Sequence, residues 1–126
     1  MNVWFILLCM FFLHVFDDFT LQGWMANGKQ KSWWKENAPA SMYKHDYVVC
    51  LILHSFSWSF LMTLPALFFR GFNVDVYYAM VLMFTIAIHA ITDDLKANRK
   101  LLNLVEDQTV HVVQVLVAWL ILVVLR

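Results

Sequence analysis

The chain has 126 residues, of which 62% are hydrophobic and only 14% charged, and its formal net charge is zero. Soluble domains average roughly 45–50% apolar and about 25% charged residues. The composition therefore excludes an ordinary soluble domain and indicates a membrane protein. The neutral balance, without any long basic tract, lacks the charge pattern of a nucleic-acid binder. We expect no nucleic-acid partner.

Four apolar stretches are each long enough to cross a bilayer, which requires about 20 mainly apolar residues per helix. They cover residues 2–21, 47–69, 76–92 and 107–125. The sequence shows no internal repeat and no flexible linker that would mark a second domain. It therefore predicts an all-α fold, an integral membrane four-helix bundle that forms one transmembrane domain over residues 1–126.

The two longer connections carry most of the basic residues. Residues 22–46 combine lysines with tryptophans, a mixture typical of the headgroup layer, so we expect an interfacial loop between the first two helices. Residues 94–106 are expected to form a short interfacial helix. Of the nine Lys and Arg residues, seven lie in these two connections. By the positive-inside rule both connections are cytoplasmic and both termini face outward.

Histidine and aspartate recur inside the apolar stretches, where ionisable side chains are costly. Three pairs have the spacing i, i+4, which places both side chains on one helix face. The full set is His14 with Asp18, His54, His89 with Asp93, and Asp107 with His111. Asp17, three residues after His14, is an alternative to Asp18. Counted along the helices, all seven lie in the cytoplasmic half, so we expect them to converge in one layer.

Buried carboxylates and imidazoles need partners, and a divalent cation can satisfy several of them at once. These ligands suit zinc, manganese or iron, and the lack of cysteine argues against a structural thiolate zinc site. We expect one or two ions, with Asp107 or Asp18 as a possible general base. The residues expected to hold the ligands in place are Gln22, Thr92, Lys96 and Gln108. The alternatives are His–Asp hydrogen bonds that only join the helices, or a proton pathway.

The motifs follow one another as His-x-x-x-Asp at 14–18, His54, His-x-x-x-Asp at 89–93 and Asp-x-x-x-His at 107–111. In this order they resemble a family of small bacterial and phage membrane proteins, the DUF3307 family, over nearly the whole chain. That family is similar to the YdjM-like membrane-bound metal-dependent hydrolases, and more remotely to the helical zinc-dependent phospholipase C and P1 nuclease group. The resemblance implies a bacterial inner-membrane protein that uses zinc to hydrolyse a phosphate ester.

These observations lead us to expect a metal-dependent hydrolase of a phospholipid or lipid-linked phosphate at the cytoplasmic interface. Lys96 is expected to meet the phosphate as a point charge, and Lys44, Arg99 and Lys100 to attract anionic lipid. The alternative is a non-enzymatic, metal-stabilised membrane protein, for instance a phage factor that binds a host membrane protein. A transporter is disfavoured, because residues 3–13 and 115–125 offer no polar path through the outer half.

Overall fold

The computed structural model of the protein describes residues 1–125, whose regular elements are all helices, with no strand in that range. Four segments are long and apolar enough to cross a membrane. The elements are α1 (Val3–Phe16), the π-helical η1 (Asp17–Leu21), α2 (Met25–Gly28), α3 (Lys31–Asn37), the 3-10 turn η2 (Ser41–Tyr43), α4 (Asp46–Phe69), α5 (Val76–Ala97), α6 (Leu104–Trp119) and the π-helical η3 (Leu120–Val124). The predicted all-α architecture with four long apolar helices is confirmed.

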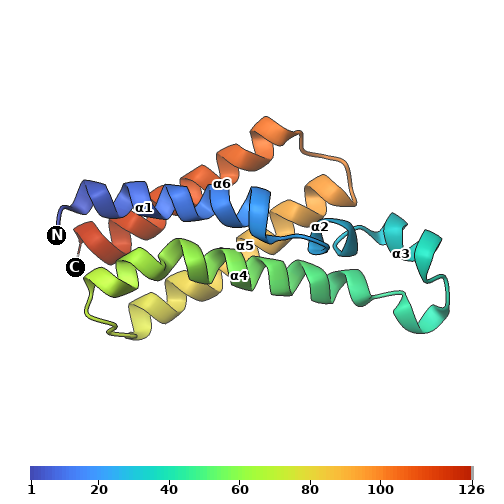
Figure 1. The fold of residues 1–126 in the computed structure, drawn as a ribbon, viewed down its shortest axis with the longest axis horizontal. Helices are drawn as coiled ribbons and strands as arrows, with labels where there is room; N and C mark the ends of the chain where they lie inside the picture. Colours follow the sequence, from blue (N-terminus) through green and yellow to red (C-terminus); the bar gives the residue numbers. More distant parts are fainter. Residues whose placement is uncertain (126) are drawn as a thin grey trace.

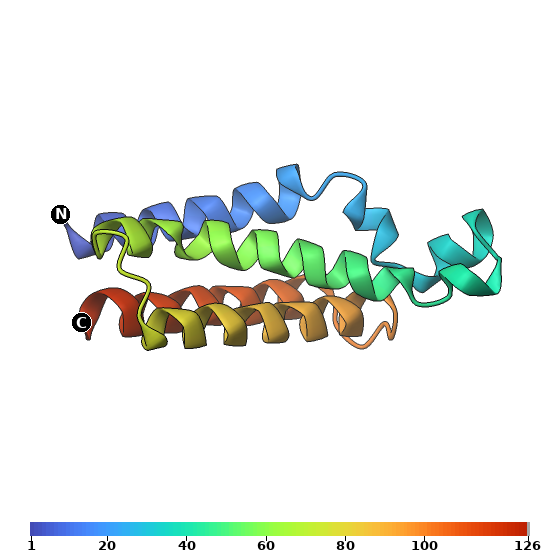
Figure 2. The same ribbon diagram turned by 90° about the horizontal axis from the view of Figure 1, so that it is seen from below.

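The four long helices form a ring in the order α1, α4, α5 and α6, in which each helix packs on the next. Figure 2 shows α1 and α4 on one side of the bundle, with α5 and α6 on the other. Both termini lie at one end, and α2 and α3 extend from the opposite end (Figure 1). We call these the terminal end and the loop end.

Two helix boundaries differ from the predicted ones. Helix α5 continues to Ala97 instead of ending at 92, and α6 begins at Leu104 instead of 107. The separate interfacial helix predicted over 94–106 is wrong, because residues 94–97 extend α5 and Asn103 forms a capping box with Glu106 at the start of α6. The predicted third helix ended where charged residues begin, but those residues continue α5. The start of α6 is set by the Asn103 capping box, which adds a turn before Asp107.

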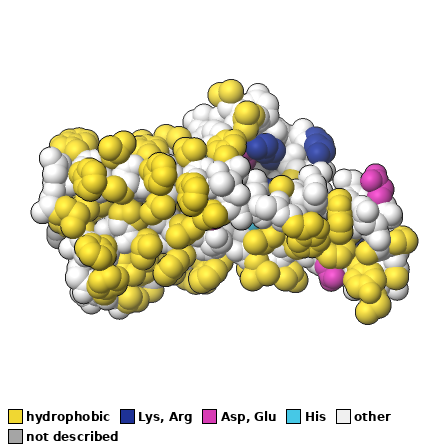
Figure 3. Space-filling view, viewed as in Figure 1, with side chains coloured by type: hydrophobic (Ala, Val, Ile, Leu, Met, Phe, Trp, Pro, Cys, Tyr) yellow, Lys and Arg dark blue, Asp and Glu magenta, His cyan; other side chains and the backbone are white. Residues whose placement is uncertain are grey.

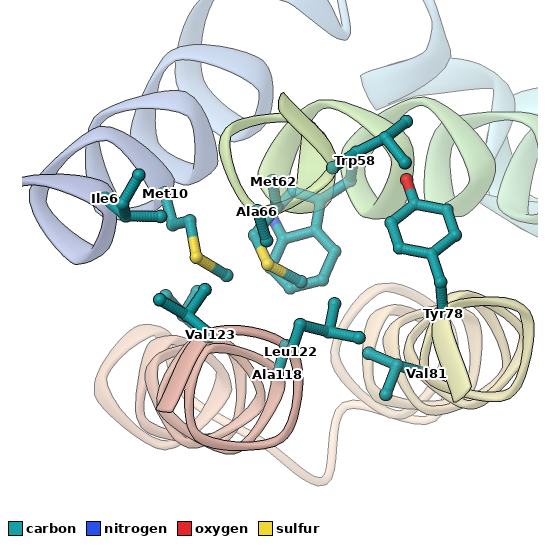
Figure 4. Packing of buried hydrophobic residues seen from close by; sticks show 12 residues of the cluster. Ile6, Met10, Trp58, Met62, Ala66, Tyr78, Val81, Ala118, Leu122 and Val123 are labelled. Atoms are coloured by element: carbon teal, nitrogen blue, oxygen red, sulfur yellow. The ribbon is translucent and has the colours of Figure 1, made fainter. Parts of the chain in front are cut away.

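An apolar core fills the terminal half of the bundle (Figure 4). Met10 of α1, Met62 of α4, Val81 of α5 and Leu122 of η3 are among its buried side chains. Trp58, which is fully buried, lies at the edge of this core nearest the loop end. Besides these side chains the terminal half buries a few hydroxyl groups, such as that of Thr63, which lies 3.0 Å from the hydroxyl of Tyr78. Within residues 1–125 it buries no charged side chain of the His/Asp set, and its interior is mainly apolar.

Apolar side chains also cover the outside of the long helices. Phe5, Phe12, Phe56, Met83 and Phe84 are half or more exposed. On the face shown in Figure 3, hydrophobic atoms spread over the terminal half, whereas Lys and Arg lie toward the loop end. Exposed apolar area on this scale indicates contact with another apolar phase, and lipid around the four spans supplies it.

Helix α2 packs against α4 at the buried Gly28, where there is no room for a side chain. A Cβ atom there would lie 2.7 Å from Cys50 Sγ and 2.9 Å from the Trp24 ring. Gly28→Ala should push α2 away from α4 and lower the free energy of unfolding by roughly 1–3 kcal/mol, measured by denaturant unfolding in detergent.

The control is Cys50→Ala, which removes the nearer of the two obstacles. The double variant should recover part of the stability lost in Gly28→Ala. No recovery would show that Cys50 does not limit the approach of α2.

Candidate metal centre

The buried His and Asp side chains form one layer across the bundle, which we call the polar layer. Its two aspartates from the N-terminal part of the chain lie where α1 passes into the π-helical turn η1. There the backbone N–H of Gln22 donates to the carbonyl of Asp17, five residues earlier, at 3.1 Å. Consecutive side chains on an α-helix point about 100° apart, yet Asp17 and Asp18 are both buried. The wider turn lets two successive carboxylates face the interior, and such π turns are frequent at functional sites.

His54 of α4 and His89 of α5 face each other, with their Nε2 atoms 3.1 Å apart. Asp18 Oδ1 lies 3.2 Å from the Nε2 atom of His54 and 3.8 Å from that of His89. Asp93 Oδ2 lies 3.5 Å from each of the two. Two ligand atoms on a tetrahedral metal, each about 2.1 Å from the ion, are roughly 3.4 Å apart. These separations therefore suit a single divalent ion.

A second group lies beside the first and shares Asp93 with it. His111 Nε2 is 3.5 Å from Asp93 Oδ1 and 3.3 Å from Asp107 Oδ1. Asp93 therefore presents one oxygen to each group, as a bridging carboxylate does between two ions. The rings of His89 and His111 stack with their centroids 4.1 Å apart.

Several buried polar atoms of these groups have no hydrogen-bond partner among the described residues. They include His111 Nε2, Asp107 Oδ1 and the Nδ1 atoms of His54 and His89. Buried polar atoms without partners are rare in folded proteins and call for an explanation such as an ion or a water. A cation between His111 Nε2 and Asp107 Oδ1 would satisfy both atoms. The donor set thus fits a divalent ion.

The structure places His14 apart from these groups, although it is buried in the same layer. Its Nδ1 accepts the indole N–H of Trp58 at 2.9 Å. A neutral imidazole has one N–H and one lone pair, so the proton then lies on Nε2 and no lone pair is left for a metal. His14 instead lies against Gln108, whose amide donates to Asp18 Oδ2 at 3.0 Å and to Asp107 Oδ2 at 3.1 Å.

Asp17, the alternative to Asp18, faces the other side of His54. Its Oδ1 accepts the hydroxyl of Ser57 at 2.7 Å, and its Oδ2 lies 3.7 Å from His54 Nδ1. At this separation the two atoms form no hydrogen bond, but the negative charge of the carboxylate favours the proton on Nδ1 and leaves the Nε2 lone pair facing the first group. Asp17 therefore lies behind His54, on the side where aspartates commonly support metal-binding histidines, whereas Asp18 faces the first group.

Two lysines reach the carboxylates from the loop end. Lys29 Nζ donates to Asp93 Oδ2 at 2.8 Å, and Lys96 Nζ donates to Asp107 Oδ2 at 2.9 Å. With neutral imidazoles, the four buried aspartates and these two lysines leave two negative charges uncompensated. One divalent cation would balance them.

The other residues expected to support the ligands make different contacts. Gln22 Nε2 donates to the backbone carbonyl of Asp18 at 2.6 Å, and the hydroxyl of Thr92 bonds to the carbonyl of Ile88 in its own helix at 2.7 Å. Neither hydrogen bond reaches a ligand side chain, whereas Lys96 and Gln108 both bind carboxylates of the centre.

Three side chains that contact the His/Asp centre were not predicted from the sequence. Trp58 stacks on His89 with ring centroids 4.3 Å apart, and Gln114 Nε2 lies 3.2 Å from His111 Nδ1. Both follow a candidate histidine by one helical turn, a spacing that could have revealed them. Lys29 had no such signal, because it depends on how the segment after η1 folds back onto α4.

Comparisons with family models, with curated proteins and with solved structures find no match to this chain. Any function must therefore be inferred from its own residues. At the loop end of a four-helix bundle, buried His and Asp side chains form three-residue groups that could hold a metal ion.

Lys29→Met tests the charge balance of the centre. Without metal, the substitution leaves Asp93 without its ammonium partner, and breaking such a largely buried pair should lower the free energy of unfolding by about 3 kcal/mol. With saturating zinc the loss should be smaller, because the cation compensates the carboxylate. The measurement is unfolding in detergent with and without chelator.

Lys31→Met is the matched control, since Lys31 lies over the Tyr47 ring and not on a carboxylate of the centre. It should cost little under both conditions. Equal losses for Lys29→Met with and without zinc would contradict compensation by a metal.

Proposed function

We propose that this protein is a membrane-embedded, metal-dependent hydrolase of a phosphate ester, with one or two divalent ions, foremost zinc, in the His/Asp centre. The observation that carries the proposal is Asp93, whose two oxygens face separate groups that contain His54 and His89 on one side and Asp107 and His111 on the other. Paired ions suit phosphate chemistry because they can clamp both the attacking and the leaving oxygen.

When bound, the metal would supply a nucleophilic water near neutral pH and stabilise charge on the phosphate oxygens. Asp107 is the proposed general base. Its Oδ2 is held by Lys96 and Gln108, while its Oδ1 has no hydrogen-bond partner among the described residues. A base needs such a free lone pair within hydrogen-bond reach of the water, so in this role Oδ1 would accept from the water instead of binding the second ion. Asp18, which Gln108 also holds, is the second candidate.

Lys29 and Lys96 are the proposed phosphate contacts. Both are bound to carboxylates that would also face the metal. Cations in the centre would compensate these carboxylates and free the ammonium groups to meet phosphate oxygens as point charges. With two divalent ions, the centre would change from two uncompensated negative charges to two positive ones, which attracts an anionic substrate.

A groove between α5 and α6 supports a lipid as the substrate. It has a volume of about 550 Å³ and is lined mainly by apolar side chains from Tyr77 and Ile121 to Ile88 and Thr109. Ile88 directly precedes His89 in α5, so the groove reaches the depth of the metal centre along the bundle. An acyl chain lying in it would bring its phosphate toward the loop end.

We also propose a bacterial inner membrane as the location, with the termini outside and the loop end in the cytoplasm. Seven of the nine Lys and Arg residues lie in the two connections at the loop end, as the positive-inside rule requires of a cytoplasmic end. A relationship to the DUF3307 family is proposed on the motif order alone.

The second candidate is a non-enzymatic membrane protein that a metal only stabilises, such as a phage factor bound to a host membrane protein. One observation favours it: Lys29 and Lys96 already pair with candidate ligands from separate parts of the chain. The polar layer can therefore hold the bundle together without any substrate.

Metal content tests the centre itself. Protein purified without chelator should carry one or two divalent ions per chain, and chelation should lower its melting temperature because the metal binds only the folded state. Asp93→Asn removes the shared carboxylate and should abolish stoichiometric binding in elemental analysis. His45→Gln, outside the centre, should leave metal content unchanged. No metal in the wild type, with a melting curve indifferent to chelator, would favour hydrogen bonding alone.

Hydrolysis separates enzyme from scaffold. Asp107→Asn keeps the size of the side chain but removes its charge, so turnover should fall by about 10²–10⁴-fold with the fold intact. The substrates are phospholipids, lipid-linked phosphates and a soluble phosphodiester, presented to zinc-loaded protein in liposomes. Asp94→Asn, whose carboxylate pairs with Arg99 outside the centre, is the control and should retain activity. If folded, metal-bound wild type never exceeds Asp107→Asn, the scaffold is the better description.

A further inference from the structure

A second pocket lies at the loop end, outside the metal centre. It is an open pocket lined by α3, η2 and the start of α4, with a volume of about 420 Å³. Three lysines and three aromatic residues line much of it: Lys31, Lys35, Lys44, Trp34, Tyr43 and Tyr47. No acidic residue is among the residues that line it.

The charge of these lysines is not balanced within the described part of the chain. Lys35 and Lys44 have no carboxylate within ion-pair distance in residues 1–125, and Lys31 lies over the Tyr47 ring at 4.9 Å from its centroid. Four other basic side chains at both ends of the bundle do pair with aspartates: Lys29, Arg70, Lys96 and Arg99. The pocket therefore gathers three ammonium groups that form no ion pair with a carboxylate among the described residues.

The aromatic wall of the pocket is held in place. The indole N–H of Trp34 donates to the carbonyl of Gly28 at 2.6 Å, and the rings of Trp34 and Tyr43 are stacked with centroids 6.3 Å apart. Tryptophan and tyrosine favour the membrane interface because one side of the ring is apolar and the other polar. The pocket thus combines a rigid amphipathic wall with cationic side chains.

The length of α4 places this pocket at headgroup depth. The helix has 24 residues and is about 36 Å long at 1.5 Å per residue, whereas the hydrocarbon core of a bilayer is about 30 Å thick. With its other end at the opposite interface, its first turn extends into the headgroup layer. His54 lies two turns farther along α4, roughly 12 Å deeper, so the pocket is distinct from the metal centre.

We propose that this pocket binds the phosphate group of an anionic membrane lipid, with Lys35 and Lys44 as its cationic contacts and Trp34 and Tyr43 against the rest of the headgroup. We assign the bound phosphate group to a membrane lipid and not to dissolved phosphate for two reasons. The pocket lies at the depth of the headgroups, and its aromatic wall would have no contact with a free phosphate ion. The site does not depend on the metal centre or on hydrolysis.

The test compares two variants of the full chain that lose the same charge at the same end of the bundle. Lys35→Gln/Lys44→Gln alters the pocket, and Arg99→Gln/Lys100→Gln alters the connection between α5 and α6. Each protein, treated with chelator in neutral detergent, is titrated with short-chain phosphatidylglycerol, short-chain phosphatidylcholine and inorganic phosphate, and binding is followed by calorimetry. Unfolding curves check that both variants remain folded.

Phosphatidylglycerol should bind the wild type about tenfold more tightly than Lys35→Gln/Lys44→Gln. Arg99 and Lys100, which the sequence predicts to attract anionic lipid, lie outside the pocket and act only as surface charge, so the control variant should stay within about twofold of the wild type. Phosphatidylcholine should bind weakly to all three proteins. Equal losses in the two variants would overturn the site in favour of general surface charge. Inorganic phosphate binding as tightly as phosphatidylglycerol would overturn the lipid as its source, and no binding to the wild type would overturn the proposal as a whole.

Discussion

The structure depends on the compensation of buried charge, since four aspartates and four histidines lie inside a bundle only four helices wide. An unpaired carboxylate at such a site is costly, and each aspartate accordingly has a donor from another element or the next turn. Asp17 accepts from Ser57, Asp18 from Gln108, Asp93 from Lys29 and Asp107 from Lys96. The close packing of α2 on α4 follows from this requirement, because the chain after Gly28 must bring Lys29 into the bundle. A local contact between Gly28 and Cys50 therefore matters to the electrostatics of the whole layer.

Trp58 connects the two halves of the bundle. One part of its ring packs with the apolar core of the terminal half, while its indole N–H donates to His14 and its face stacks on His89. Tryptophan suits this boundary because it combines a large apolar surface with a single donor. The polar layer thus lies next to a mainly apolar, well-packed core. This core fixes the spacing of the four helices, on which the positions of the His and Asp side chains depend.

The long helices and the shared layer of His and Asp residues could be predicted, because hydropathy and i, i+4 spacing are local properties of the chain. The ends of α5 and α6 could not, since a hydropathy pattern does not distinguish a polar residue that ends a helix from one that faces its interior, as Asp93 does. His14 and Asp18 have the same spacing as the other pairs, yet the role of His14 depends on Trp58, 44 residues away. Lys29 meets Asp93 across 64 residues. Such contacts come from the packing of whole elements, and no local pattern encodes them.

The position of Trp58 also has an electrical consequence. A transmembrane voltage falls mainly across the part of the membrane that insulates, which in this bundle is the apolar half between Trp58 and the termini. A cation that enters from the loop end would stop on the polar side of Trp58, so its affinity should depend less on the membrane potential than that of an ion that crosses the whole bundle. An ion in the polar layer would thus lie inside the bundle and still be coupled more strongly to the compartment at the loop end than to the one at the terminal end.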